Sequence, residues 1–293
     1  MSGPVKHLAR YATAVDETRI YYEAHGLAAG PGEGPPPAVV LVHGSGGHHA
    51  AWWQQVPALR GSYSVITLDL RGFGRSDAVT GTDGTVSSEG TADDILAVLR
   101  DPALRATGIG PAVLVGQSVG AAAALRAAMS LSPADRRELI AGVVLAASLG
   151  GIDDPALNER VRLDRAAADA IPVLDRLLTP AFRENEPALT FLFRQMGTFN
   201  VAGMADLRHL NSDGPTVSEL KEADLPLCLL SGSLDAVLSP ETIRTAAGVL
   251  PNTHVELVED APHSMYWEAP EQFNDALKRF LATVLTDPQE IPA

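Results

Sequence analysis

The pentapeptide Gly-Gln-Ser-Val-Gly at residues 116–120 places a serine where it could act as a nucleophile. An apolar run precedes it at 112–115 and an alanine-rich segment follows at 119–130, so a sharp turn from a strand into a helix is expected. Glycine at both ends lets strand and helix approach closely, and the bend pushes the Ser118 hydroxyl out above the sheet. The pattern alone arises easily by chance, but in this context it predicts a nucleophilic serine.

A serine hydroxyl becomes a nucleophile only when a base takes its proton, and a carboxylate usually orients that base. Asp235 and His263 each follow directly after a predicted strand, so both are expected at the same sheet edge as Ser118. The order serine, acid, histidine is the one this arrangement requires. If Asp235 lay far from His263, Asp153 or Asp154 would be the alternative acid.

A glycine-rich loop, His-Gly-Ser-Gly-Gly at 43–47, follows the apolar run 38–42. Attack on a carbonyl places negative charge on its oxygen, which fixed N–H donors must stabilise. The backbone N–H groups of Ser45 and Val119 are the predicted oxyanion hole. A phosphate-binding loop is a poor alternative, because neither a following Lys-Ser/Thr nor G-x-G-x-x-G spacing is present.

Side chains and loop glycines near these elements are the candidates for binding substrate. They are Gly44, Gly46, His48, Trp52, Gln117, Phe191 and Trp267. The apolar residues around Phe191 in the sequence favour a small hydrophobic substrate. The adjacent histidines at 48 and 49 suggest a metal, but neighbouring side chains rarely converge and no third ligand is close in sequence, so neither metal nor cofactor is expected.

Apolar runs alternate with helix-compatible segments along most of the chain. The runs lie at 38–42, 65–68, 112–115, 142–147, 225–230 and 254–258, after a predicted hairpin of 10–15 and 18–24. The helical segments are 51–59, 88–99, 119–130 and 270–285. This alternation predicts an α/β fold with a mostly parallel, eight-stranded sheet and helices on both faces.

The alternation breaks between 151 and 222, where helical segments are expected at 157–171, 173–178 and 187–196. We therefore expect a helical lid at 151–222, inserted into a core domain formed by 1–150 and 223–293. The glycine- and proline-rich segment 26–37 could be a domain linker. A surface loop is favoured, because too little chain precedes it to form a domain.

Composition excludes some partners. The net charge of −14 argues against nucleic acid, and no apolar stretch is long enough to cross a bilayer. The first seven residues contain no apolar segment of a signal peptide, and the single cysteine, Cys228, is expected to be a buried residue of a strand. A cytoplasmic location is the expectation.

Together these features resemble the α/β-hydrolase fold superfamily. The sequence Asp-Leu-Arg-Gly-Phe-Gly-Arg-Ser at 69–76 is similar to a motif of its lid-bearing, epoxide-hydrolase-like branch, where it is structural. Epoxide hydrolases and haloalkane dehalogenases carry an aspartate where this chain has Ser118, which argues against both reactions. The resemblance further implies a monomer or homodimer, and a Ser45 hydroxyl able to contact substrate.

The leading hypothesis is a serine hydrolase acting on an ester, lactone or similar carbonyl bond of a small hydrophobic molecule. Carbon–carbon bond hydrolysis, a lyase reaction or acyl transfer on the same triad is the first alternative. A slow-turnover, receptor-like binding protein is the second. The lack of a histidine beside the elbow serine argues against a cofactor-free dioxygenase.

Overall fold

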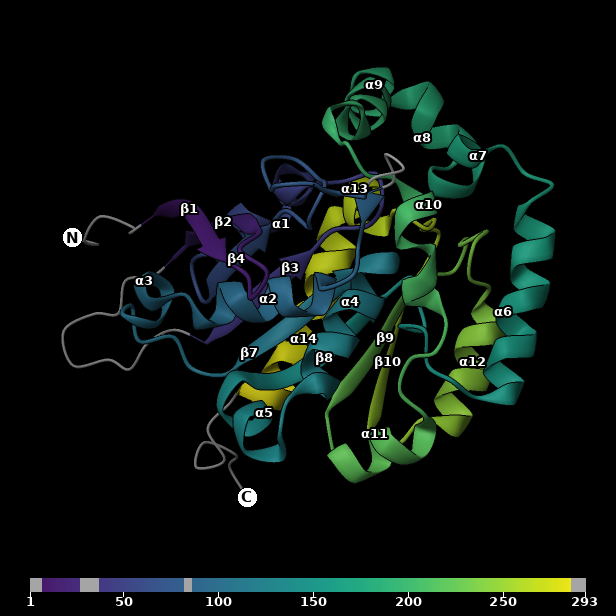
Figure 1. The fold of residues 1–293 in the computed structure, drawn as a ribbon. Helices are drawn as coiled ribbons and strands as arrows, with labels where there is room; N and C mark the ends of the chain where they lie inside the picture. The colour runs from purple at the N-terminus through teal and green to yellow at the C-terminus, as the bar shows by residue number, and fades with distance from the viewer. Residues whose placement is uncertain (1–6, 27–36, 82–85, 286–293) are drawn as a thin grey trace.

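The computed structural model describes residues 7–26, 37–81 and 86–285. Its main feature is an eight-stranded sheet in the order β1-β2-β4-β3-β7-β8-β9-β10 (Figure 1). Only β2 runs antiparallel to its neighbours, so the mostly parallel sheet is confirmed. The strands are β1 (Leu8–Thr13), β2 (Arg19–His25), β3 (Ala38–Val42), β4 (Ser64–Leu68), β7 (Ala112–Gln117), β8 (Ile140–Ala146), β9 (Leu227–Gly232) and β10 (Thr253–Val258).

Helices cover both faces of the sheet, as predicted. One face carries α2 (Thr91–Arg100), α4 (Val119–Ser130) and α12 (Pro240–Val249), and the other carries α1 (Gln55–Leu59), α13 (Met265–Glu268) and α14 (Pro270–Leu285). Alternate residues of β3 point to opposite faces, Val40 into the first core and Val39 into the second. Shorter elements are β5 (Val79–Thr80), β6 (Val86–Ser87), α3 (Pro102–Arg105) and α5 (Pro133–Leu139).

The helix expected at 51–59 is not continuous. A 3₁₀ turn, η1 (His49–Trp52), precedes the five-residue α1. Pro57 lies in the first turn of α1, where its missing N–H costs nothing. A helix running through from residue 51 would have placed Pro57 in its interior, so that expectation was wrong.

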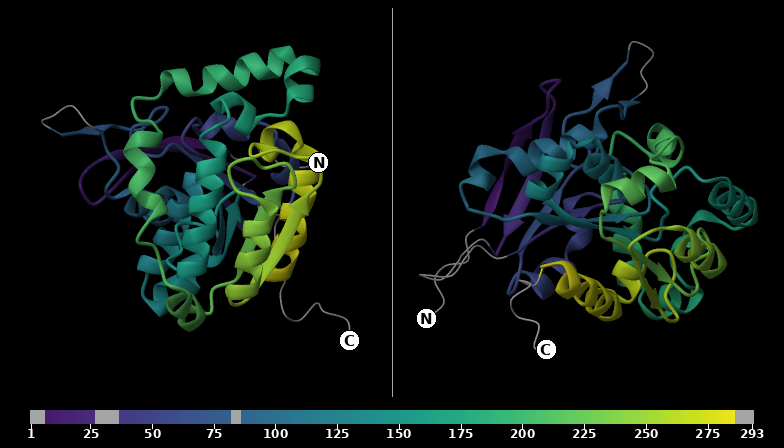
Figure 2. Two further views of the ribbon diagram at one scale, coloured as in Figure 1. Left: turned by 90° about the vertical axis from the view of Figure 1, so that its right-hand side faces the viewer. Right: turned by 90° about the horizontal axis from the view of Figure 1, so that it is seen from below.

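A helical segment joins β8 to β9, as expected. It comprises α6 (Pro155–Ala168), α7 (Val173–Leu177), α8 (Pro180–Asn185), α9 (Pro187–Met196), η2 (Gly197–Phe199), α10 (Met204–Leu207), η3 (Arg208–Asn211) and α11 (Val217–Ala223). Its two ends pack on the core, α6 against α12 and η3 against α4, whereas α7 to α9 stand above the carboxyl edge of the sheet (Figures 1 and 2).

Cys228 is fully buried on β9, as predicted, and burial raises the pKa of its thiol. Among the helices described, none is both long and apolar enough to cross a membrane. Most of the glycine- and proline-rich segment 26–37 and the first six residues lie outside the described part of the chain.

Candidate active site

Ser118 occupies a strained turn between β7 and α4. Its backbone angles, φ 52° and ψ −123°, belong to a region that residues with a side chain rarely adopt. A Cβ on Gly116 would lie 2.3 Å from the Cα of Ala121, and one on Gly120 would lie 2.4 Å from the carbonyl oxygen of His43. Both glycines are therefore required by close backbone contacts, as the pentapeptide indicated.

The clash at position 120 allows a stability prediction. Gly120→Ala should lower the free energy of unfolding by about 2–3 kcal/mol, because backbone rather than a flexible side chain would have to move. Gly46→Ala is the matched control, since a Cβ there meets nothing within 4 Å, and its effect should stay within about 0.5 kcal/mol. If urea unfolding showed the same loss of unfolding free energy in Gly120→Ala and Gly46→Ala, the close backbone contact at Gly120 would not explain the loss.

Asp235 and His263 meet as the sequence predicted. The ring Nδ1 of His263 lies 3.0 and 3.1 Å from the two Asp235 oxygens, and both side chains are buried. The carboxylate also accepts the N–H groups of Val237 at 2.7 Å and Leu238 at 2.9 Å. When Nδ1–H donates to this acceptor-only partner, Nε2 keeps its lone pair and can accept a proton.

The alternative acids have other roles. Asp154 caps α6 by accepting N–H groups of the helix start, and Asp153 accepts the side-chain amide of Asn158. The loops that carry Asp235 and His263 also interlock. Leu234 N–H donates to the Ala261 carbonyl at 2.9 Å.

His43 anchors the glycine-rich loop and is not a catalytic base. Its Nδ1–H donates to the Gly44 carbonyl at 2.7 Å, and its Nε2 accepts the Leu70 N–H at 3.0 Å. Both ring nitrogens are thus used, and burial lowers the pKa of His43 to about 4. The ring remains neutral and holds the loop against the turn that follows β4.

This buried histidine predicts a pH effect on stability. The unfolded chain takes up a proton at about pH 6.5, whereas the folded chain resists it until about pH 4, so the unfolded state binds more protons between these values. Stability from His43 is complete above pH 6.5 and falls by about 3 kcal/mol towards pH 4. Urea unfolding of wild type and His43→Gln across this range should show a shallower dependence in the variant. If the unfolding free energies of wild type and His43→Gln changed equally with pH, the assignment of this pH effect to His43 would be wrong.

The motif at 69–76 is structural, as the resemblance implied. Burial alone would raise the pKa of Asp69, but hydrogen bonds from His49 and the Arg75 N–H hold that pKa below its ordinary value. Arg71 is buried in a two-point ion pair with Asp94, at 2.7 and 2.6 Å. These contacts fix the turn on which the active-site loop rests.

Asn200, which no sequence motif marks, connects the inserted segment to this region. Its side-chain NH₂ donates to the Gly47 carbonyl at 3.1 Å, and its side-chain oxygen accepts the Gly74 N–H at 3.0 Å. A second tie is the Ser264 N–H, next to His263, which donates to the Leu177 carbonyl at 3.1 Å. The inserted segment therefore contacts the glycine-rich loop and the loop that carries His263.

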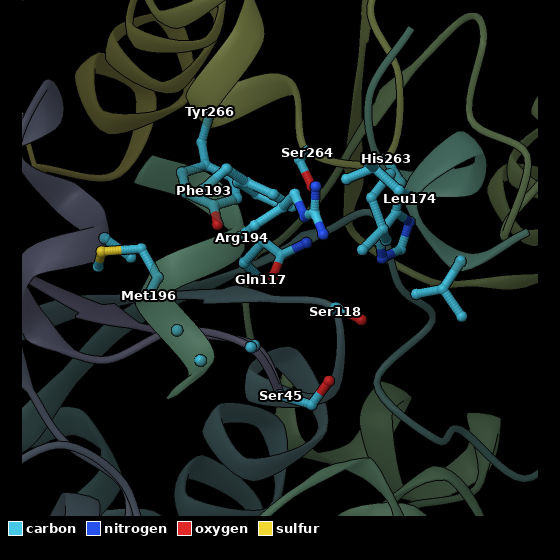
Figure 3. Close-up of a pocket in the computed structure, with 17 residues that line it drawn as sticks. Ser45, Gln117, Ser118, Leu174, Phe193, Arg194, Met196, His263, Ser264 and Tyr266 are labelled. Atoms are coloured by element: carbon cyan, nitrogen blue, oxygen red, sulfur yellow. The ribbon is translucent and has the colours of Figure 1, made fainter. Parts of the chain in front are cut away.

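A cavity of about 340 Å³ lies at the carboxyl edge of the sheet and contains Ser118 and His263 in its wall. Figure 3 shows Ser45, Ser118 and His263 around it, together with side chains from α7 and α9. Its lining residues are Gly44, Ser45, Gly46, Gly47, Ala51, Gln117, Ser118, Val173, Leu174, Leu177, Phe193, Arg194, Met196, Gly197, His263, Ser264 and Tyr266.

Gly44, Gly46 and Gln117 line the cavity as predicted, whereas four predicted binding residues do not. Trp52 is fully buried, with its ring centroid 5.0 Å from that of Tyr266, and Trp267 is buried against Phe193. His48 and Phe191 also lie outside the lining, and Phe191 is 64% exposed. The cavity wall therefore does not include these four residues. The role of the Val119 N–H stays a prediction.

The histidines at 48 and 49 do acquire a third neighbour, Asp69, which the sequence did not reveal. However, the Asp69 carboxylate already accepts the backbone N–H and Nδ1 of His49 and the N–H of Arg75. His48 Nδ1 accepts the N–H of Ala50. This group is satisfied internally, so it is a hydrogen-bonded cluster.

Comparison with known proteins agrees with the fold. The model of the alpha/beta hydrolase family matches residues 39–276. A thermophilic esterase from Thermogutta terrifontis is 26% identical, with a TM-score of 0.71 over 96% of this chain and 100% of its own. An enol-lactonase from Burkholderia xenovorans is 26% identical, with a TM-score of 0.68 over 93% and 99%. BpoC of Mycobacterium tuberculosis, a proposed non-heme bromoperoxidase, is 28% identical over 78% of this chain and 87% of its own. The chain belongs to the alpha/beta hydrolase family and is an enzyme of that type.

Proposed function

We propose that the protein is a serine hydrolase that cleaves an ester, lactone or similar carbonyl bond in a small, mainly hydrophobic molecule. The observation that carries this proposal is the buried Asp235–His263 hydrogen bond beside a cavity whose wall includes Ser118. The similarity to an esterase and an enol-lactonase supports the same reaction class.

In the proposed mechanism, Ser118 Oγ attacks the carbonyl carbon while Nε2 of His263 takes its proton. The negative oxygen accepts the N–H groups of Ser45 and Val119. His263 then protonates the departing alkoxide, leaving an acyl group on Ser118. Water, deprotonated by the same histidine, releases the acid, and Asp235 stabilises the charged ring throughout.

A substrate panel tests this proposal. Short-chain p-nitrophenyl esters and lactones should be hydrolysed, whereas vinylogous diketones should be poor substrates. Cleavage of the diketones alone would instead identify a carbon–carbon bond hydrolase. Binding without product from any member of the panel would identify a receptor-like protein and overturn the proposal.

We further propose that α7 to α9 act as the lid predicted at 151–222 and set substrate choice. Leu174, Phe193 and Met196 contribute apolar side chains to the cavity wall, which suits the expected hydrophobic substrate. Arg194 adds a cation, which has no hydrogen bond or ion pair to any part of the chain that the structure describes. An acyl group that ends in a carboxylate would satisfy it.

Arg194→Gln should therefore lower kcat/KM about tenfold for an ester whose acyl chain ends in a carboxylate. This loss is at the low end of the range for a hydrogen bond to a charged group, because Arg194 is exposed to solvent. The corresponding neutral methyl ester should be unaffected. Arg244→Gln on α12 is the control, since this exposed arginine does not line the cavity. Equal losses for both esters would show that Arg194 does not select charge.

A further inference from the structure

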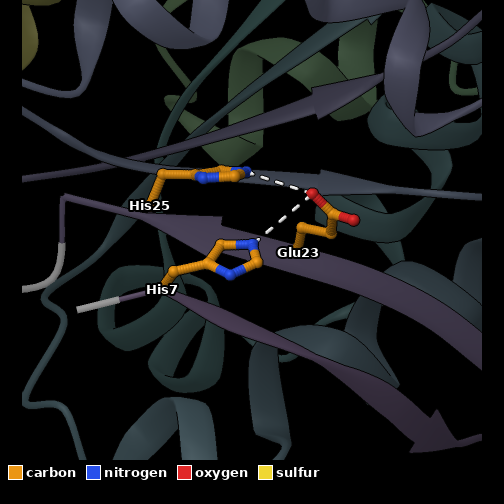
Figure 4. Close-up of side chains that lie close together, drawn as sticks. All are labelled: His7, Glu23 and His25. Atoms are coloured by element: carbon orange, nitrogen blue, oxygen red, sulfur yellow. Dashed lines mark ion pairs between the residues drawn. The ribbon is translucent and has the colours of Figure 1, made fainter. Parts of the chain in front are cut away.

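A second group of polar side chains lies on the edge strands, outside the catalytic cavity. His25 and Glu23 are two residues apart on β2, so their side chains share one face of the sheet. His7 immediately precedes β1, and the pairing of Leu8 with Ala24 brings it opposite His25. Figure 4 shows the rings of His25 and His7 one above the other, both facing the same oxygen of the Glu23 carboxylate.

The separations in this group are those of metal ligands. Nε2 of His25 lies 3.4 Å and Nε2 of His7 lies 3.6 Å from the same oxygen, Oε2 of Glu23. Both exceed ordinary hydrogen-bond lengths of about 2.7–3.2 Å. Two ligands of a tetrahedral zinc ion, bonded at about 2.0–2.1 Å, are roughly 3.3–3.4 Å apart. All three ligand atoms lie within 4.8 Å of one another.

The surrounding residues hold these ligands in place. The Tyr21 hydroxyl donates to the other Glu23 oxygen at 2.6 Å. Such outer hydrogen bonds orient metal-binding carboxylates. After His25 the chain is confined at Gly26, where a Cβ would lie 2.5 Å from the carbonyl oxygens of Arg60 and Tyr63.

A metal ion could reach these three side chains from solvent. Side-chain exposures of 50%, 22% and 16% for His7, Glu23 and His25 leave an entry path from solvent.

We propose that His7, Glu23 and His25 form a binding site for one divalent transition-metal ion of the zinc type. Two imidazoles and one carboxylate are a common zinc ligand set, and a water would complete the tetrahedron. The ion would fasten the residue that precedes β1 to the end of β2. The cluster of His48, His49 and Asp69 differs, because its carboxylate is already taken up by internal hydrogen bonds.

The test uses the untagged, metal-free, full-length chain titrated with Zn²⁺ by calorimetry, and with Co²⁺ by visible absorption. We expect one Zn²⁺ per chain, a tetrahedral Co²⁺ spectrum and a higher melting temperature with Zn²⁺. His7→Gln and Glu23→Gln should each weaken binding at least about tenfold, and Tyr21→Phe by about tenfold. Melting of the metal-free variants detects any folding defect, and the half-exposed His7 is the substitution least able to cause one.

His254→Gln is the matched control. His254 also pairs with a carboxylate two residues along its strand, Glu256, at 2.8 Å. It belongs to neither of the metal-compatible groups found in the described residues. Its substitution should leave Zn²⁺ affinity unchanged. Absence of stoichiometric Zn²⁺ binding would overturn the proposal, and so would unchanged Zn²⁺ affinity in His7→Gln and Glu23→Gln. A loss of Zn²⁺ affinity found only in His49→Gln would also overturn it, because the metal would then bind at the other cluster.

Discussion

Ser118→Ala is expected to lower kcat for ester hydrolysis by at least about 10⁴-fold, because no other group replaces the attacking oxygen. The residual rate would come from binding and oxyanion stabilisation alone. Steady-state kinetics on a p-nitrophenyl ester measure the loss. Removing this side chain leaves the strained backbone turn in place, so the variant should fold.

The control for this substitution is Ser130→Ala, at the far end of the same helix, where the hydroxyl donates only to the Ala127 carbonyl. Its kcat should match that of wild type. A Ser118→Ala enzyme with a kcat within tenfold of wild type would contradict the nucleophile assignment.

Ser45→Ala separates the two proposed roles of Ser45, because the backbone N–H remains after the change and only the hydroxyl is lost. A loss of kcat of up to about tenfold would fit a hydroxyl contact with substrate.

Asp235→Asn is expected to lower kcat by about 10³–10⁴-fold. The amide oxygen would keep the N–H bonds from Val237 and Leu238 and would therefore turn its NH₂ towards His263. Nδ1 of the imidazole would then have to accept, which moves the ring proton to Nε2. That nitrogen could no longer take the proton of Ser118.

Asp153→Asn is the matched control, because this exposed carboxylate was the alternative acid and instead accepts the Asn158 amide. Its kcat should change less than about twofold. Melting temperatures of both variants distinguish a lost function from a lost fold. A larger loss from Asp153→Asn than from Asp235→Asn would reverse the assignment of the acid.

The core of the fold was predictable because its signals are local. Two-sided apolar runs marked β3 and β7, and the alanine-rich segment marked α4 with its observed bounds, Val119–Ser130. Two local signals were overlooked. Pro57 sets the late start of α1, and Asp154 with Pro155 starts α6 two residues ahead of its expected beginning at 157.

The candidate triad was predictable because parallel strands bring their carboxyl ends to one edge, wherever they lie in the sequence. The rest of the pocket was not, because being next to a site residue does not decide which way a side chain faces. Tyr266 lines the cavity, whereas its neighbour Trp267 packs against Trp53 and Phe193. Arg194 depends on how α9 rests over the sheet, which only the tertiary contacts reveal.

Mass spectrometry of the folded protein after reaction with a fluorophosphonate tests the nucleophile most directly. We expect one phosphonyl group per chain, on the peptide that contains Ser118, no adduct in Ser118→Ala and slower labelling in Asp235→Asn. Ser45 and Ser264 also line the cavity and serve as internal comparisons. An adduct on either of them, or a folded enzyme with no adduct at Ser118, would contradict the assignment.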